Sequence, residues 1–236
     1  MTNFLPTATA FAGLLLLAGC ATTYEFEADA IADEADPLAG YESYLLVPAD
    51  PEKEGTLRFR EAAEYVEAAL SGRGLYPAPD REQADLLVEL DYGISEPRTE
   101  TESRSVSRRG ASSIEIVPVY ARSKSSGRLV LVGRQTIGMP GAIYRDKELV
   151  SRTVYTKYMK LNAFDYDPSA ATPKGKEVWS VHVKNENGSD QLRKYLPLLA
   201  AASIDLIGTD TGAEQTRVRL KEDAEVIDFV RSASTL

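Results

Sequence analysis

The pattern of apolar residues between positions 44 and 92 constrains the fold most strongly. Residues 44–48 form a short apolar segment that ends in Pro48, and this predicts a strand that stops at the proline. Across residues 56–71 apolar side chains recur at i, i+3, i+4 and i+7, which predicts an amphipathic helix. Residues 84–92 begin as a nearly continuous apolar run, typical of a buried central strand. We therefore expect the fold to open with a β-α-β unit.

Hairpin-forming segments dominate the chain after residue 110. The polar turn 123–127 contains Gly127 and separates two strand-like segments, 114–122 and 128–136. Further strands are expected at 152–165, 177–184 and 215–220, a helix at 189–208 with Pro197 inside it, and either a short helix or a last strand at 223–232. These segments predict an α+β fold, with a mostly antiparallel sheet of about seven strands and two or three helices packed on one face.

Composition excludes several classes of site. The 236 residues include one cysteine and one histidine, so neither a zinc cluster nor a disulfide framework can form. The net charge of −9 and the pI near 4.9 argue against general nucleic-acid binding. The histidine, His182, falls on a strand face away from Trp179 and is interpreted as a surface residue. We expect no cofactor, no metal and no catalytic residues.

The first twenty residues have the features of a sorting signal. They carry no charged side chain, and residues 8–19 are almost entirely apolar. Twelve residues extend about 18 Å as a helix, which is too short for a hydrocarbon core of about 30 Å. The run ends in Leu17, Ala18, Gly19 and Cys20, which looks like the bacterial lipobox. The resemblance implies cleavage before Cys20, acylation of that cysteine, and attachment to a membrane through the lipid.

The expected domain organisation follows from this signal and from the charge pattern. Residues 1–19 are the signal peptide, and residues 20–40 are the lipidated cysteine followed by an acidic flexible tether. From residue 21 to residue 55 the chain has ten acidic residues against Lys53 alone. The tether is either a spacer or a docking segment. Residues 41–236 form a single periplasmic domain with a basic insert at about 98–139. Because Ala21 rather than aspartate follows the cysteine, the resemblance to lipoproteins implies the outer membrane.

A wider resemblance rests on the order of these segments. A strand ending in proline, a helix ending in Gly72-Arg73-Gly74-Leu75-Tyr76, and the segment 81–90, REQADLLVEL, follow one another. The late strand 176–183, KEVWSVHV, precedes a helix. In this order the chain resembles the DUF4136-type bacterial lipoproteins. The resemblance implies a fold and a location in the cell envelope, and it implies no chemistry because that group has no established activity.

The basic insert holds the candidate binding residues. The segment from Arg104 to Arg134 has a net charge of +6, with Glu115 as its one acid. The polar segment 103–110 is expected to be a mobile loop. An anionic partner or ligand is one interpretation, with lipopolysaccharide phosphates, an anionic cell-wall polymer or an acidic protein as candidates. Protection of an edge strand, or folding back onto the tether, are the alternatives. The candidate binding residues are Arg104, Arg108, Arg109, Arg122, Lys124 and Arg128.

Two further groups suggest weaker hypotheses. Saccharide stacking or ordinary cross-strand packing could explain an aromatic set comprising Tyr144, Tyr155, Tyr158, Tyr166 and Trp179. A carboxylate-based hydrolase would draw on Asp165, Asp167 or Glu177. The leading expectation is a non-enzymatic, lipid-anchored outer-membrane protein that binds or scaffolds an envelope partner. A binder of anionic glycolipid or cell-wall polymer is the alternative, and the hydrolase comes after both.

Overall fold

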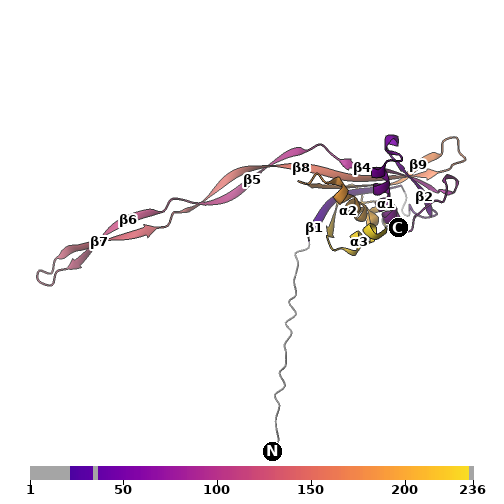
Figure 1. The fold of residues 1–236 in the computed structure, drawn as a ribbon. Helices are drawn as coiled ribbons and strands as arrows, with labels where there is room; N and C mark the ends of the chain where they lie inside the picture. Colours follow the sequence, from indigo (N-terminus) through magenta and orange to yellow (C-terminus); the bar gives the residue numbers. More distant parts are fainter. Residues whose placement is uncertain (1–21, 34–36, 234–236) are drawn as a thin grey trace, which may run out of the picture. The chain divides into compact units, whose positions relative to one another are not determined.

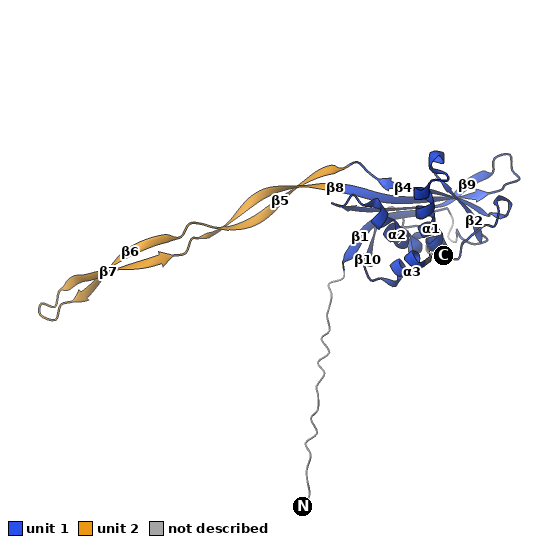
Figure 2. Cartoon of the chain, viewed as in Figure 1, with its two compact units in different colours: residues 1–96, 155–236 blue, residues 97–154 orange. Residues whose placement is uncertain are grey.

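The computed structural model describes residues 22–33 and 37–233, so the signal peptide and the lipobox residues Leu17–Cys20 lie outside the described residues. The chain divides into two compact units, shown in Figure 2. Unit 1 comprises residues 1–96 and 155–236, and unit 2 comprises residues 97–154. Unit 2 therefore extends to residue 154, beyond the end of the insert predicted near 139, and the single domain over 41–236 stays a prediction. Residues 143–154 are the first part of a strand that pairs with residues 98–109, and local patterns do not reveal such pairing.

Unit 1 contains a sheet with the strand order β10-β1-β9-β8-β4-β2-β3 (Figure 1). Its strands are β1 (Thr23–Ala32), β2 (Ser43–Pro48), β3 (Tyr76–Pro77), β4 (Leu86–Ile94), the second part of β8 (Ile143–Tyr166), β9 (Lys174–Asn187) and β10 (Thr216–Lys221). The helices are α1 (Leu57–Ser71), α2 (Leu192–Ser203) and α3 (Glu225–Ala233), with short 3₁₀ turns at Pro51–Lys53, Arg81–Gln83 and Ile204–Leu206.

The fold is mixed α and β with a mainly antiparallel sheet, as expected. The described residues form ten strands rather than seven, and three α-helices. Strands β2 and β4 are parallel neighbours and α1 connects them. This β-α-β unit does not open the fold, because β1 precedes it.

Local chemistry explains the helix boundaries. The Thr56 hydroxyl accepts a hydrogen bond of 3.2 Å from the amide of Phe59, and so caps α1. After α1, Gly74 has φ +82°, a conformation that glycine adopts without strain. Helix α2 spans Leu192–Ser203, within the predicted range 189–208, and Pro197 lies inside it. At 223–232, where either a short helix or a last strand was expected, the structure has helix α3.

The predicted flexible tether is wrong for residues 23–32, because they form β1, which lies between β9 and β10. The reason is that apolar and acidic residues alternate along this segment, as in a half-buried strand, and the acidic composition obscured this pattern. Every second side chain of β1 is buried against the helices, and the buried set is Tyr24, Phe26, Ala28 and Ala30.

The acidic residues of β1 lie on the opposite face of the sheet, where each faces a base. In each case the acid and the base are directly opposed cross-strand neighbours. The pairs are Glu25 with Arg219 at 2.8 Å, Glu27 with Lys184 at 3.0 Å, and Asp29 with His182 at 3.7 Å. The negative charges of Glu25 and Glu27 are therefore compensated within unit 1.

Unit 2 consists of two antiparallel strand pairs. Strand β5 (Arg98–Arg109) pairs with the first part of β8, from Arg98 opposite Val154 to Arg109 opposite Ile143. Strands β6 (Ser113–Arg122) and β7 (Leu129–Met139) form a separate two-stranded sheet, here called the β6–β7 hairpin. The predicted hairpin over 114–136 is confirmed. The predicted mobile loop at 103–110 is wrong, because its alternating Arg and Ser residues pair in β5.

Candidate interaction site on the β6–β7 hairpin

The β6–β7 hairpin exposes large apolar side chains on both faces. The register places Ile114, Ile116, Tyr120, Leu129 and Leu131 on one face. Ile137 and Met139 lie on the other face with Val119 and Val130. Ile114 is 73% exposed and Leu129 is 66% exposed, whereas strands β1 and β4 bury alternate side chains almost completely. Exposed apolar surface of this kind marks sites that contact another molecule.

A two-stranded sheet without a covered face is marginally stable in water. Strands β6 and β7 form a sheet of their own, and none of the residues 113–139 belongs to the hydrophobic core of the described chain. Its two strands are held by cross-strand pairing, with a register shift between Val119 and Tyr120. A partner that covers these faces would remove apolar area from water at about 25 cal/mol per Å².

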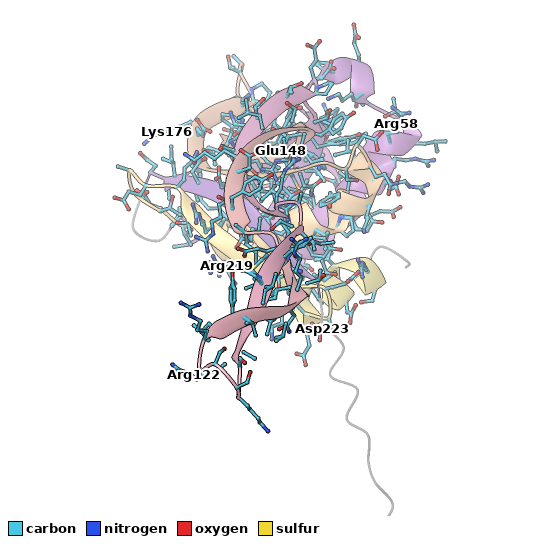
Figure 3. The ribbon with its side chains drawn as sticks, turned by 90° about the vertical axis from the view of Figure 1, so that its left-hand side faces the viewer. Arg58, Arg122, Glu148, Lys176, Arg219 and Asp223 are labelled. Atoms are coloured by element: carbon cyan, nitrogen blue, oxygen red, sulfur yellow. The ribbon has the colours of Figure 1, made fainter. Side chains whose placement is uncertain are left out.

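Three cations surround the turn of the hairpin. Arg122, Lys124 and Arg128 lie within seven residues, and the turn closes with a hydrogen bond of 2.8 Å from the Ser123 amide to the Arg128 carbonyl. The Arg122 guanidinium donates to the Gly127 carbonyl at 3.2 Å, and its side chain lies at the turn end of the hairpin (Figure 3). None of the three cations forms an ion pair with any residue in the described ranges.

The other three predicted binding residues lie elsewhere in unit 2. Arg104, Arg108 and Arg109 are in β5, and Glu148 of β8 is directly opposite Arg104. The Arg108 guanidinium is 3.8 Å from a Glu148 carboxylate oxygen. The six candidate residues therefore form two sets. The sequence-based charge count missed acids on β8 because β8 is about forty residues further along the chain.

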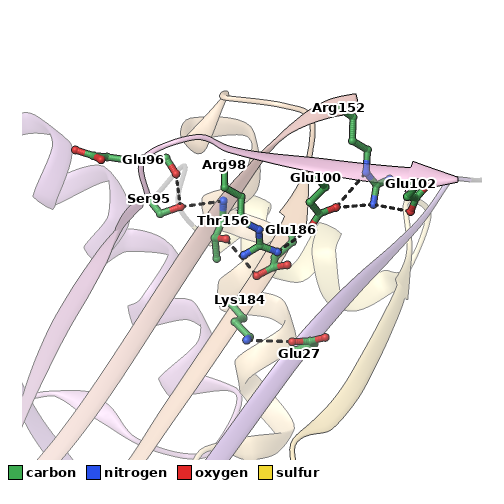
Figure 4. A network of polar contacts seen from close by, with 10 residues as sticks. All are labelled: Glu27, Ser95, Glu96, Arg98, Glu100, Glu102, Arg152, Thr156, Lys184 and Glu186. Atoms are coloured by element: carbon green, nitrogen blue, oxygen red, sulfur yellow. Dashed lines mark hydrogen bonds and ion pairs between the residues drawn. The ribbon is translucent and has the colours of Figure 1, made fainter. Parts of the chain in front are cut away.

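Strand β5 begins in a ladder of ion pairs (Figure 4). Glu100 accepts hydrogen bonds of 2.9 Å from Arg98 and from Arg152, and these bonds lower the pKa of its carboxyl. Arg152 also lies 3.5 Å from Glu102. The residues are exposed to solvent, where such pairs contribute little to stability. Arg98 and Arg152 are nevertheless paired with acidic residues, so this end of unit 2 has less unpaired positive charge than the turn of the β6–β7 hairpin.

The aromatic set is not one surface. Trp179 is buried in the core, whereas Tyr158 lies on the opposite face of the sheet with its ring 6.4 Å from His182. Tyr144 belongs to unit 2. The residues therefore do not form the shared stacking face that saccharide binding would need.

The carboxylates proposed for hydrolysis have separate partners. Asp165 accepts a hydrogen bond from the Tyr41 hydroxyl. Asp167 accepts bonds from the hydroxyl and amide of Ser169, which lower the pKa of its carboxyl and so oppose a role as general acid. Across the described ranges, no group of three or more His, Cys, Asp or Glu side chains is placed to hold a metal ion. None of the described helices is long and apolar enough to cross a membrane.

Sequence reasoning missed a buried lysine in unit 1. The Lys157 ammonium is fully buried and donates to the Asn187 side-chain oxygen at 2.6 Å and to the Ser189 carbonyl at 2.7 Å. It also lies 4.5 Å from the centroid of the Tyr195 ring. Burial lowers the pKa of this ammonium. Side chains alternate between the two faces of β8, and Lys157 lies on the same face as the buried Met159. This alternation is the sequence signal that could have identified Lys157 as buried.

Comparisons with known proteins add little. No protein-family model and no curated protein matches the chain. Among solved structures, the chain is similar to a PDZ domain protein from Parabacteroides distasonis ATCC 8503, with 12% sequence identity and a TM-score of 0.39 over 85% of this chain. The chain spans 40% of the length of that protein. A TM-score this low carries no argument about fold or function.

Proposed function

We propose that this chain is a lipid-anchored protein of the bacterial envelope that binds or scaffolds a protein partner through the β6–β7 hairpin and catalyses no reaction. The exposure of apolar side chains on both faces of that hairpin carries the proposal. A ligand that fills a pocket cannot cover two faces of a ribbon, whereas a folded partner can. The partner surface is expected to be apolar, with acidic groups opposite the cations of the turn.

The anchoring part of the proposal rests on the sequence Leu17-Ala18-Gly19-Cys20 and on the resemblance to DUF4136-type lipoproteins. Ala21 supports the outer membrane, and attachment there would be on its periplasmic face. Only residues 21 and 22 separate Cys20 from the start of β1 at Thr23. A lipid on Cys20 would therefore hold β1 within about 10 Å of the bilayer, because each residue extends by at most about 3.6 Å.

A second candidate function follows from the turn cations. Arg122, Lys124 and Arg128 without acidic partners would suit the phosphates of an anionic glycolipid or the charges of a cell-wall polymer. Such binding would weaken steeply as salt rises, whereas binding through apolar faces would not. Salt dependence therefore separates the two candidates.

Affinity capture of the full lipidated chain from cells tests the proposal. The variant Ile116→Thr, Tyr120→Thr, Leu131→Thr removes apolar surface from one face and keeps residues that favour strands. We expect capture of a stoichiometric protein partner to fall at least tenfold. The control Ile31→Thr, Tyr76→Thr alters exposed apolar residues of unit 1 and should leave capture unchanged. Equal capture by the wild-type chain and the hairpin variant would contradict the proposal.

Two further arms complete this experiment. Cys20→Ser should move the protein from the membrane fraction to the soluble fraction, and full retention in the membrane would contradict the anchor. Arg122→Glu, Lys124→Glu, Arg128→Glu reverses the charge of the turn, with Arg217→Glu on β10 as a single-site control. Loss of glycolipid binding in the charge variant, without any protein partner in either form, would favour the second candidate.

A further inference from the structure

A groove in unit 1 has no role in the proposal above. It lies where the first turns of α1 and α2 meet the end of β4, and its volume is about 570 Å³. This volume is in the range of small-molecule sites, roughly 300–1,000 Å³. Its apolar lining consists of Leu57, Tyr92, Ile94, Leu192 and Leu196. The groove is therefore large and apolar enough for a hydrocarbon chain.

The charged residues of the groove leave one cation unpaired. Arg193 of α2 is paired with Glu61 of α1, with Nε 2.5 Å from a carboxylate oxygen, and the pair joins the two helices beside the groove. Arg58 also lines the groove, and it forms no ion pair with any residue that the structure describes. One guanidinium is therefore available to an anion.

Among the described residues that line the groove, Glu61 is the one acid, and it is already paired with Arg193. Neither α1 nor α2 has an acidic residue in its first turn. Acidic side chains favour this position because helix N-termini carry partial positive charge. Gln191 at the start of α2 also makes no capping hydrogen bond from its side chain. The first turns of α1 and α2 therefore contain no acidic side chain that would pair with Arg58.

We infer that this groove binds a single acyl chain that ends in a carboxylate, as in a fatty acid. The chain would lie against Leu57, Leu192 and Leu196. The carboxylate would receive two parallel hydrogen bonds from the Arg58 guanidinium. A monoanion matches one unpaired guanidinium, whereas a phosphate dianion would bring a second charge that only the paired Arg193 could meet. The inference is independent of the β6–β7 hairpin.

Calorimetric titration of the full chain tests the inference, with dodecanoate and hexadecanoate below their micellar concentrations as probes. We expect saturable binding at one site. Arg58→Glu should weaken it at least tenfold. The matched control Arg60→Glu changes an exposed arginine of the same helix that does not line the groove, and it should leave the affinity within twofold. Dodecyltrimethylammonium, with the same chain and the opposite charge, should not bind.

The position and the head group are tested separately. Leu57→Asp alters a side chain that is 73% exposed, so the fold should survive while binding is lost. The hairpin variant Ile116→Thr, Tyr120→Thr, Leu131→Thr should bind dodecanoate as the wild-type chain does. The inference is overturned by the absence of saturable binding with both fatty acids, by equal weakening in Arg58→Glu and Arg60→Glu, or by equal binding of the cationic chain. Tighter binding of dodecyl phosphate would overturn the assignment of a carboxylate.

Discussion

Replacing Phe26 with alanine is expected to lower the free energy of unfolding by about 3–5 kcal/mol, the usual loss for a buried phenylalanine. Phe26 is 1% exposed and packs in the core of unit 1. Denaturant unfolding of the full chain, followed by circular dichroism, measures the change. The result separates a strand at 23–32 from a flexible tether, because a residue in a solvated tether contributes nothing to stability.

The neighbouring residue provides the control for this prediction. Glu27 lies on the other face of β1 and pairs with Lys184 at a partly exposed position. Glu27→Ala should cost less than about 1 kcal/mol, as partly exposed ion pairs usually do. A loss below about 0.5 kcal/mol for Phe26→Ala would mean that β1 does not belong to the folded sheet.

Replacing Lys157 with methionine is expected to cost about 1–3 kcal/mol at neutral pH, the usual loss when a buried polar group is left unpaired. The change leaves the Ser189 carbonyl without its donor, and an unpaired buried acceptor is costly. The Asn187 side-chain oxygen loses one of its two donors and still accepts a hydrogen bond of 2.9 Å from the Ser189 amide. Lys160→Met is the control, because Lys160 is exposed on the same strand and should cost less than about 1 kcal/mol. Thermal unfolding of the three proteins provides the comparison, and equal losses would contradict the role of the buried ammonium.

The same lysine predicts a dependence on pH. Burial lowers the pKa of Lys157 in the folded chain below its ordinary value of 10.5. Between the folded and the unfolded pKa, the unfolded chain binds the additional proton, so the contribution of Lys157 to stability rises with pH. The difference in stability between the wild-type chain and Lys157→Met should therefore widen as the pH is raised from neutral toward the unfolded pKa. A constant difference would contradict the lowered pKa.

Elements with a strong local signal were predictable. Helix α1 combines a capping threonine, an apolar stripe and a following glycine, and each of these is visible within twenty residues. The β6–β7 hairpin was equally predictable, because its turn contains Gly127 between two segments rich in branched residues. In both cases short-range chemistry determines the conformation, so no knowledge of distant partners is needed.

Strands β1 and β5 were missed because their partners are far away in the chain. Glu25 is compensated by Arg219 and Glu27 by Lys184, more than 150 residues later, so the segment reads as an acidic tether when it is considered alone. The Ser residues of β5 read as a polar loop, yet each faces a residue of β8 in the ladder. A polar or acidic composition therefore cannot distinguish a solvated loop from a paired strand unless the pairing partner is known.

The candidate site was predictable in part for the same reason. The turn cations Arg122, Lys124 and Arg128 lie close together because a local turn brings them there. Arg108 could not be assessed without knowing that Glu148 lies beside it. The apolar residues of the hairpin resemble those of any buried strand, and only the structure shows that their side chains are exposed.

Site-specific photocrosslinking in living cells tests the central claim most directly. A photoreactive residue would replace Ile116 on one hairpin face, Ile137 on the other, or the exposed Glu64 of α1 in the full lipidated chain. We predict one adduct of defined mass from each hairpin position and none from position 64. Adducts from position 64 with none from either hairpin position would show that the partner binds unit 1, and would contradict the role assigned to the β6–β7 hairpin.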